Sequence, residues 1–502
     1  MNQENTKNLS GSKLSFLIAC LVITISFFFF SNRFYPLLNS DDGISILMIH
    51  YFDWKSGLYF WGQDRLGSLV PFLGRLIYIL FHPNAILAES ISHYLIMAAG
   101  YFAISTFLRS PVSRIILCII WFFPPFHMIE IHHNALGLEY SVLGIGLYFM
   151  HRSLRGRAKT SMHRLFFFAV SFIFFILAIW VSDLDLVSIA VVFGIILWYK
   201  FKSFHYNPIR AVLNIPVGYY LVALIGVLSG AMFIAYCKSV SLNTIDYQSL
   251  AGYKPFVQTS GIFLQSMWSL FIFKAGEPFT SIYLYLVVGF GIVLVVCVFS
   301  NEKIHWSPVT LFFALQTIIL LLVVLSSKWV LMNEVGRRYF ISIYLSIWIT
   351  LLLLLEKKMQ SGLKKMRWIS FSLLLIAIFG GSGTILHLRY IWPGTLTPKY
   401  TILKEFKDYG NIGVIGNYWN SYVISSIDPD HIVASTSDEM FCRKKELTPL
   451  VFKQERLFIV RDGWFEHFPD TMFLYNHVLQ RKSEEKMIGD CFACEYKVLR
   501  DQ

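Results

Sequence analysis

The sequence predicts an all-α polytopic membrane protein with about eleven transmembrane helices and a small α/β domain at its C-terminal end. Of the 502 residues, 56% are hydrophobic and only 15% are charged. A soluble protein of this size needs more charge to cover its surface, so much of the apolar content must face lipid. Apolar runs recur as far as residue 390, and the pattern changes sharply after it.

Each long apolar run predicts one membrane-spanning helix, because a helix needs about 20 apolar residues to cross a bilayer. The runs are 14–31, 86–107, 112–129, 135–151, 165–182, 184–200, 211–235, 282–300, 308–327, 339–355 and 369–388. The run 68–81 is shorter, which indicates a re-entrant or interfacial helix. No small-residue cleavage site follows the first run, so we interpret it as a retained anchor and not a signal peptide.

The basic residues predict the orientation of these helices. The formal charge of +12 could indicate nucleic-acid binding, but Lys and Arg collect in alternate loops and form no single patch. The positive loops contain Arg109, Arg114, Arg152, Arg155, Arg157, Lys159, Arg164, Lys200, Lys202, Arg210, Lys303, Lys357, Lys358, Lys364, Lys365 and Arg367. These loops are expected in the cytoplasm, with the N-terminus inside and the C-terminal region outside. Three outside segments follow from this: 32–85, 236–281 and 328–338.

Residues 1–390 therefore form the predicted transmembrane domain, which includes the first outside loop, 32–85. Residues 391–502 form the extracytoplasmic domain. Short apolar runs at 413–416, 431–434 and 457–460 alternate there with helical-looking stretches at 399–408 and 469–482, which predicts an α/β fold. Its cysteines are Cys442, Cys491 and Cys494. Zinc needs about four ligands, which these three cysteines do not supply. A disulfide is therefore expected if the domain lies outside the cytoplasm, and the sequence does not show which two of the three cysteines form it.

Two adjacent carboxylates, Asp41 and Asp42, follow the first span. They lie just outside the predicted membrane, at the start of an amphipathic stretch. A carboxylate in a half-buried mouth can accept a proton from an attacking hydroxyl. Adjacent helical residues point about 100° apart, so only one of them is expected to face a given site. The alternative is a helix cap formed by Ser40 or Asp41.

Three further polar clusters are candidates for substrate binding. Gln63, Asp64 and Arg65 lie in an ordered, aromatic-rich loop, Tyr59 to Pro71, next to the apolar run 68–81. Composition alone describes it as an interfacial loop. Glu130, His132, His133 and Asn134, with Glu139 soon after, could bind a metal with carboxylate help or could be polar residues at a span end.

The third cluster breaks the positive-inside pattern. Lys328, Arg337, Arg338 and Tyr339 lie in or after a short outside loop. A guanidinium binds phosphate oxygens bidentately, so an anionic lipid phosphate would explain arginines at this place. The alternative is that these side chains reach lipid headgroups by snorkelling.

In their order along the chain, these features resemble the GT-C superfamily of membrane glycosyltransferases. Its members include the protein O-mannosyltransferases, the lipid A aminoarabinose transferase and the Rgt-type sugar transferases. The resemblance lies in the acidic pair of the first outside loop, the run Trp61–Pro71, the many spans and the late loop ending in Arg338-Tyr339. It covers the membrane portion. In the tail it is weaker and depends on Gly416-Asn-Tyr-Trp419. Many relatives have Asp-Glu where this chain has Asp-Asp, which leaves the identity of the base open.

The resemblance implies a transferase in the bacterial inner (plasma) membrane that takes a sugar from a polyprenyl-phosphate donor. An acceptor hydroxyl of an envelope glycan, lipid or protein would attack the anomeric carbon on the outer face, with inversion. Asp41 or Asp42 would be the general base. Arg337 or Arg338, with Lys328, would offset charge on the departing phosphate. Gln63, Asp64, Arg65, Glu130, His132, His133 and Tyr339 would bind substrate. No cofactor is expected, with a divalent metal still open, and no nucleic-acid partner.

Three other functions remain open. A transporter or lipid flippase would place charged groups near the membrane midplane, often with repeated halves. The informative charges here cluster at the predicted outer face, and the sequence has no internal repeat. An O-antigen ligase or polymerase would also use outside arginines and a polyprenyl-linked donor, but such enzymes depend on a large outside loop in mid-chain. An inactive scaffold with the same fold is the third.

Overall fold

The computed structural model describes residues 3–133, 138–154, 160–241, 252–299, 306–359, 365–461 and 466–501. Asn134 and the loop residues Arg155, Arg157, Lys159, Lys303 and Lys364 lie outside this range. The chain divides into two compact units. The helical unit comprises Met1–Ser26, Leu95–Tyr236 and Asp246–Gly394. The sheet unit comprises Phe27–Tyr94, Cys237–Ile245 and Thr395–Gln502.

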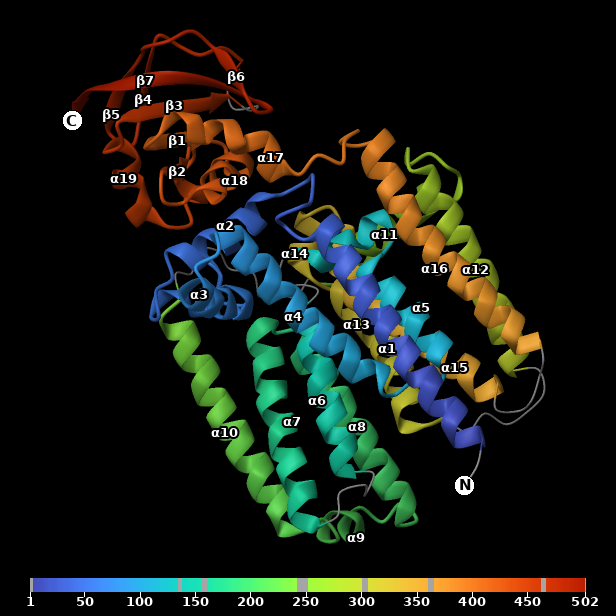
Figure 1. Cartoon of the computed structure of the whole chain (residues 1–502). Helices are drawn as coiled ribbons and strands as arrows, with labels where there is room; N and C mark the ends of the chain where they lie inside the picture. Colours follow the sequence, from blue (N-terminus) through green and yellow to red (C-terminus); the bar gives the residue numbers. More distant parts are fainter. Residues whose placement is uncertain are drawn as a thin grey trace. The chain divides into compact units, whose positions relative to one another are not determined.

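The predicted spans all coincide with helices. Their bounds are α1 (Gln3–Phe30), α4 (Ala85–Ser105), α5 (Pro111–Phe122), α6 (Leu138–Leu154), α7 (Ser161–Val181), α8 (Asp185–Ser203), α10 (Val217–Ser239), α12 (Pro278–Phe299), α13 (Pro308–Leu325), α15 (Ile341–Met359) and α16 (Lys365–Tyr390) (Figure 1). Within the described residues, nine helices are long and apolar enough to cross a membrane. A tenth is counted if α5 and the 3-10 helix η2 (Phe126–His132), bent by 89°, form one span. The polytopic helical fold is thereby confirmed.

The structure differs from the prediction at four α-helices. The span expected at 112–129 is broken, because the chain bends at Phe123-Pro124-Pro125, where proline disfavours continuation of α5. The segment 236–281, expected as an outside loop, contains a 19-residue helix, α11 (Tyr253–Phe271). The sequence of α11 mixes polar and apolar residues and contains no long apolar run, so it does not predict a membrane-spanning helix. The short helices α9 (Pro208–Leu213) and α14 (Lys328–Met332) were not expected.

Small residues allow the helices of this unit to approach closely. A β-carbon on Gly100 of α4 would lie 2.4 Å from the Ser141 backbone of α6, and one on Gly146 would lie 2.7 Å from the Phe175 ring of α7. Helices α6 and α7 lie side by side along most of their length (Figure 1). Close backbone approach through glycine is typical of helix packing in membranes.

The sheet unit contains a seven-stranded sheet. Its strands are β1 (Ile412–Gly416), β2 (Ile432–Thr436), β3 (Arg456–Arg461), β4 (Thr471–Leu474), β5 (His477–Arg481), β6 (Lys486–Ile488) and β7 (Cys491–Asp501) (Figure 1). They are arranged in the order β2-β1-β3-β7-β5-β4, with β6 also on β7. Strand β1 is parallel to β2 and β3, whereas β7 is antiparallel to its neighbours. The α/β fold of the tail is confirmed.

Part of the tail was predicted wrongly. The stretch 469–482, expected to be helical, forms the hairpin of β4 and β5. Tyr475 and Asn476 both have positive φ, at 50° and 64°. A two-residue turn of this conformation matches the twist of paired strands and so favours a hairpin. The helical expectation for 399–408 agrees with α17 (Lys399–Leu403) and the 3-10 helix η5 (Lys404–Tyr409).

The core of the sheet unit combines the first outside loop with the tail. One hydrophobic cluster contains Ile46 and Ile49 of α2 (Ser40–His50) with Val414 and Phe458 of the sheet. A second contains further residues of α2 and Trp61 together with the opposite face of the sheet. The compact unit thus takes in residues that the sequence-based boundary at 390/391 assigned to the transmembrane domain.

The remaining elements of this unit are short. They are the 3-10 helix η1 (Ser56–Leu58), α3 (Leu69–Phe81), α18 (Tyr418–Ile427), the 3-10 helices η6 (Glu439–Phe441) and η7 (Lys445–Leu447), and α19 (Thr448–Phe452). Helix α3 is apolar but has only 13 residues, so it agrees with the re-entrant or interfacial helix expected at 68–81.

The disulfide expected in the tail is wrong for the described chain, where Cys442, Cys491 and Cys494 are buried free thiols. Cys491 and Cys494 are three residues apart on β7, so their side chains point to opposite faces of the sheet. Cys491 accordingly packs in one hydrophobic cluster and Cys494 in the other. Cys442 lies 3.5 Å from the Thr448 hydroxyl, Sγ to Oγ1. All three are packing residues.

Candidate active site

The two aspartates of the first outside loop have different environments. Asp42 is the third residue of α2 and completes a capping box with Asn39. Its carboxylate accepts from the Asn39 backbone N–H at 3.2 Å, and its own N–H donates to the Asn39 side chain at 3.1 Å. The side chain is buried, with a relative exposure of 1%. Such reciprocal bonds satisfy N–H groups that a helix start leaves without partners.

Asp41 is half-buried and points to the tail. The Tyr418 hydroxyl donates a hydrogen bond of 2.7 Å to Asp41 Oδ1. Tyr418 is the first residue of α18 and belongs to the run Gly416–Trp419 that the sequence comparison singled out. Of the two carboxylates, Asp41 is thus the more exposed.

Two basic side chains of the loop between η6 and η7 lie over aromatic rings of this unit. The Arg443 guanidinium lies 5.3 Å from the centre of the Tyr418 ring, and the Lys444 ammonium lies 4.9 Å from the ring of Trp61. Burial and the Asp41 charge raise the pKa of Tyr418 well above its ordinary value, although Arg443 opposes this rise. Tyr418 therefore remains protonated and acts as a hydrogen-bond donor.

The loop that carries Gln63, Asp64 and Arg65 is ordered by an isolated β-bridge between Tyr59 and Gly67. Gln63 is buried, with 8% exposure, and its backbone N–H bonds the Phe60 carbonyl at 3.0 Å. Asp64 and Arg65 are half-buried. All three belong to the sheet unit, as do Asp41 and Asp42.

The late arginines belong to the helical unit. Arg337 begins the 3-10 helix η4 (Arg337–Phe340), and its Nη1 donates to both Glu277 oxygens, at 3.2 and 2.9 Å. His127 of η2 also contacts the Glu277 carboxylate. Burial raises the pKa of Glu277, and Arg337 opposes this effect. The sequence analysis did not single out Glu277 or His127, because they lie far from Arg337 in the chain.

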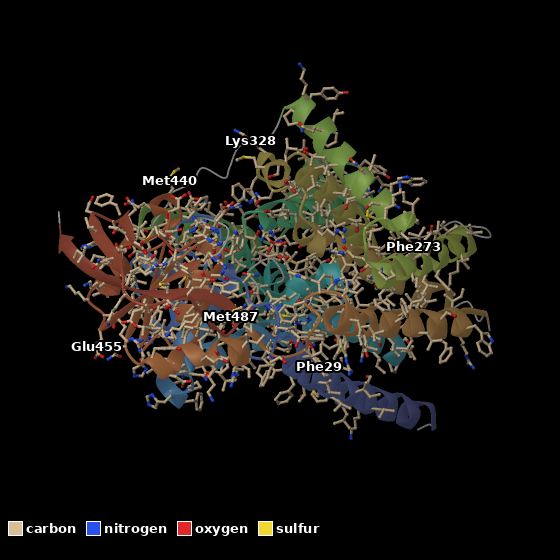
Figure 2. All side chains as sticks on the ribbon, turned by 90° about the horizontal axis from the view of Figure 1, so that it is seen from above. Phe29, Phe273, Lys328, Met440, Glu455 and Met487 are labelled. Atoms are coloured by element: carbon tan, nitrogen blue, oxygen red, sulfur yellow. The ribbon has the colours of Figure 1, made fainter. Side chains whose placement is uncertain are left out.

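Arg338 is held more loosely than Arg337. Its Nη1 lies 4.0 Å from Glu130 Oε2, and its guanidinium carbon lies 5.3 Å from the Tyr339 ring centre. Both partners are partly exposed, at 23% for Arg338 and 38% for Glu130. Lys328 is exposed on α14 (Figure 2). The structure thus brings three predicted residues together: Arg338, Tyr339 and Glu130.

The histidines next to Glu130 are deeply buried. His132 and His133 have exposures of 1% and 2%. The His132 ring lies 6.2 Å from that of Phe122, centre to centre. Within the described residues, no group of three or more His, Cys, Asp or Glu side chains could hold a metal ion. These histidines are packed side chains at the end of η2.

Two buried carboxylates in the spanning helices form a separate cluster. Glu139, in the first turn of α6, accepts a hydrogen bond from the Ser342 hydroxyl. Asp185, the first residue of α8, interacts electrostatically with Glu139. Carboxylates in the first turn are stabilised by the positive end of the helix dipole.

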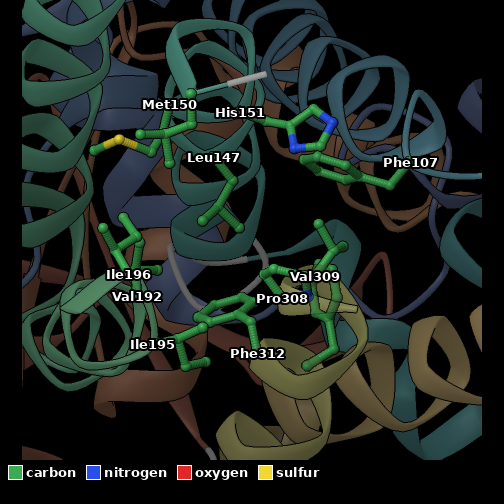
Figure 3. A pocket seen from close by; sticks show the side chains of 12 residues that line it. Phe107, Leu147, Met150, His151, Val192, Ile195, Ile196, Pro308, Val309 and Phe312 are labelled. Atoms are coloured by element: carbon green, nitrogen blue, oxygen red, sulfur yellow. The ribbon is translucent and has the colours of Figure 1, made fainter. Parts of the chain in front are cut away.

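An apolar cavity of about 90 Å³ lies between α6, α8 and α13 (Figure 3). Leu147, Val192 and Phe312 contribute to its wall, and the His151 ring faces that of Phe107 with centres 5.1 Å apart. The cavity is near the C-terminal end of α6, roughly 18 Å along the helix from Glu139. It is lined by apolar groups and lies at the end of α6 that leads into a basic loop.

No family model matches the chain, and no curated protein matches it in sequence. ArnT from Cupriavidus metallidurans in the apo state is similar in structure, with a TM-score of 0.54 and 11% identity over 90% of this chain and 94% of that chain. The same enzyme bound to undecaprenyl phosphate gives a TM-score of 0.54 and 13% identity over 96% and 97%.

The likeness extends over nearly the whole of both chains, while the sequences have diverged almost completely. It therefore concerns the arrangement of helices and sheet and not individual residues. This likeness in fold agrees with the order of sequence features described above, from the acidic first loop to the tail. The chain thus has the same overall fold as ArnT.

Proposed function

We propose that this protein is a glycosyltransferase that moves a sugar from a polyprenyl-phosphate donor to a hydroxyl of an envelope glycan, lipid or protein. The observation that carries the proposal is the half-buried Asp41 carboxylate, held by Tyr418 in a unit that also contains Gln63, Asp64 and Arg65. The ArnT-like fold and the bound undecaprenyl phosphate of the similar ArnT structure support a lipid-linked donor.

In the proposed reaction Asp41 is the general base. The acceptor hydroxyl gives its proton to the Asp41 carboxylate as its oxygen attacks the anomeric carbon. The bond between that carbon and the phosphate oxygen breaks, and its electron pair remains on the polyprenyl phosphate. Attack opposite the departing phosphate inverts the configuration of the sugar. A positioned carboxylate base contributes about 10²–10⁴-fold to such a step.

Asp42 is assigned a structural role. Its carboxylate is engaged by the helix cap and buried, so a substrate hydroxyl could reach it only if α2 lost its capping box. A cap contributes about 1 kcal/mol to stability. The cap expected at Ser40 or Asp41 is wrong, because the N-cap is Asn39 and Asp42 completes the capping box. This leaves Asp41 for the proposed role of base.

Arg338 is proposed to bind the donor phosphate, with Lys328 and Tyr339 as further contacts. Arg337 is already paired with Glu277 in a bond to both carboxylate oxygens. Removing it from that partner would leave a largely buried carboxylate without its cation, which is costly. Arg338 and Arg337 are similarly exposed, at 23% and 25%, but Arg338 lies at the outer limit of an ion pair with Glu130, so an entering phosphate can compete for it.

The placement in the cell follows from the basic loops. We propose that the protein lies in the inner membrane with its N-terminus in the cytoplasm and the tail outside, because the positive loops alternate along the chain. The sugar would then be transferred on the outer face.

Mass spectrometry of lipid-linked and envelope glycans tests the proposal in cells carrying wild type, a deletion, Asp41→Asn or Asp42→Asn. We expect the deletion and Asp41→Asn to lose the same sugar. Asp42→Asn should keep the sugar, in proportion to the amount of folded protein in the membrane. If the deletion changes a glycan and neither aspartate variant does, the base assignment is wrong and a ligase or transporter becomes the better proposal.

A further inference from the structure

Asp41 and two residues of the tail, Tyr418 and Arg443, form a cluster in the sheet unit. The Tyr418 hydroxyl donates to Asp41 Oδ1 at 2.7 Å, and the Arg443 guanidinium lies 5.3 Å from the centre of the Tyr418 ring. Arg443 and Tyr418 come from the C-terminal tail, while Asp41 comes from the first outside loop. Arg443 is buried, with 9% exposure, so its charge is poorly screened by water.

The backbone on both sides of this contact is fixed. Asn417 caps α18 by accepting from the Asn420 N–H at 3.0 Å, which sets the position of Tyr418. The Ser40 hydroxyl, next to Asp41, donates to the Tyr418 backbone carbonyl. A hydroxyl and a carboxylate held in this way keep one relative orientation, whereas two flexible side chains would not.

The hydrogen bond also orients the Asp41 carboxylate. An ionised carboxylate accepts only, at two oxygens with about four lone-pair sites. Tyr418 occupies one of these sites on Oδ1 and so fixes the rotation of the carboxylate. The Arg443 charge near the Tyr418 ring opposes the rise of the Tyr418 pKa and so makes its hydroxyl a stronger hydrogen-bond donor to Asp41.

We propose that Tyr418, supported by Arg443, is a positioning residue for the Asp41 base, so that the C-terminal domain completes the catalytic machinery. This inference depends on the proposed function. It assigns to the tail a task in the chemical step. The competing explanation is that Tyr418 only joins α18 to α2, in which case its hydroxyl would affect stability and not the reaction.

Helix α18 offers a matched control. Tyr422 lies one turn after Tyr418, is buried at 1% exposure, and its hydroxyl accepts from the Arg443 backbone N–H at 2.7 Å. Tyr422→Phe removes a buried hydroxyl from the same helix without touching the bond to Asp41. Tyr418→Phe removes the hydroxyl that bonds Asp41 and retains the ring. Both variants are compared by their thermal unfolding in detergent.

The test measures sugar transfer by the full-length protein in membranes. The donor probe is the lipid-linked sugar fraction extracted from the deletion strain, titrated into membranes that contain wild type or a variant. We expect Tyr418→Phe to lower the maximal rate between about tenfold and 100-fold, the range for a hydrogen bond to a charged group. The amount of extract that gives the half-maximal rate should stay unchanged. Tyr422→Phe should transfer within about twofold of wild type.

The double variant separates positioning from a structural role. In Asp41→Asn the base is absent, so adding Tyr418→Phe should lower any residual rate by less than about twofold. Equal maximal rates for Tyr418→Phe and Tyr422→Phe, with Asp41→Asn inactive, would overturn the inference and leave the proposed function intact. A multiplicative loss in the double variant would also overturn it. Full activity of Asp41→Asn would instead reject the base assignment on which the inference depends.

Discussion

Gly43 of α2 and Tyr422 of α18 are in backbone contact across the junction of the first outside loop and the tail. A β-carbon built on Gly43 would lie 2.9 Å from the Tyr422 carbonyl oxygen and 3.0 Å from its carbonyl carbon. A backbone group cannot move aside as a side chain can, so only glycine fits here. The bond between Asp41 and Tyr418 lies at the same junction.

Gly43→Ala is therefore expected to separate α2 from α18. Overpacking of this kind costs about 1–3 kcal/mol, and it should raise the hydrogen exchange of the α2 and α18 amides in the full-length protein in detergent. Sugar transfer should fall with it. Gly57→Ala is the control, because a β-carbon there meets only the Phe52 ring at 3.8 Å. If the α2 and α18 amides exchange at the same rate in Gly43→Ala and Gly57→Ala, the close contact between Gly43 and Tyr422 is not essential.

The helix cap gives a second prediction. Asp42→Ala should destabilise the start of α2 by about 1 kcal/mol, because the Asn39 N–H loses its acceptor. Exchange of the first amides of α2 reports the loss. Asn39→Ala removes the other half of the capping box and should give a similar increase. If Asp42→Ala lowers the rate of sugar transfer much more than Asn39→Ala does, the role of Asp42 is not purely structural.

The arginine pair gives a third prediction, with undecaprenyl phosphate as the probe. Arg338→Gln should weaken its binding about tenfold, the loss expected when a charge-assisted phosphate bond is removed. Arg337→Gln should mainly lower the unfolding temperature, because it leaves the buried Glu277 without its partner.

The variant Glu130→Gln tests the direction of the electrostatic effect on phosphate binding at the same site. It removes the carboxylate that lies 4.0 Å from Arg338, so binding of the phosphate should become tighter and not weaker. Weaker binding in Glu130→Gln, or unchanged binding in Arg338→Gln, would place the donor phosphate elsewhere. Native mass spectrometry of the purified protein measures all of these affinities.

The fourth prediction concerns pH and the sheet. Glu495 of β7 is 8% exposed; burial acts to raise its pKa, but Arg456 at 2.6 Å and Lys482 at 2.7 Å hold it below the ordinary 4.5. A carboxyl group with a lowered pKa in the folded state stabilises the fold above its unfolded-state pKa. That contribution is lost as the pH falls through the folded-state pKa.

Glu495→Gln should therefore destabilise the sheet near neutral pH by about 1–3 kcal/mol. The difference from wild type should begin to shrink as the pH falls below about 4.5, where the unfolded chain becomes protonated, and should be lost at the lower pH where the folded protein takes up the proton. Hydrogen exchange of the β3 and β7 amides measures this difference in stability. Glu446→Gln in η7 is the control, because Glu446 is exposed. A difference that does not depend on pH would contradict the role of the charge.

The sequence predicted the membrane helices well because their signal is local. An apolar run of the right length must form a helix in lipid, where every backbone group needs a partner within the segment. Helix α11 was missed because its sequence mixes polar and apolar residues. The hairpin of β4 and β5 was mistaken for a helix because short polar stretches carry a weak periodic signal, and two residues with positive φ determined the turn.

The candidate site was predicted only in part. The acidic pair, the loop at Gln63 and the late arginines could be found from residue type and position along the chain. The partners of Arg337 could not, because Glu277 and His127 approach it only when η2, η4 and the start of α12 fold together. The cysteines were interpreted as a disulfide because spacing does not reveal which face of a strand each side chain occupies.

The sequence by itself determined the class of the protein: its spans, its basic loops, the acidic first loop and an α/β tail. The tertiary structure alone decided that Asp42 caps a helix while Asp41 meets Tyr418, and that the first outside loop shares its core with the tail. The physical reason is the distance along the chain between the residues that determine each property. Helix formation depends on neighbours a few residues away, whereas the environment of a carboxylate depends on side chains that only folding brings to it.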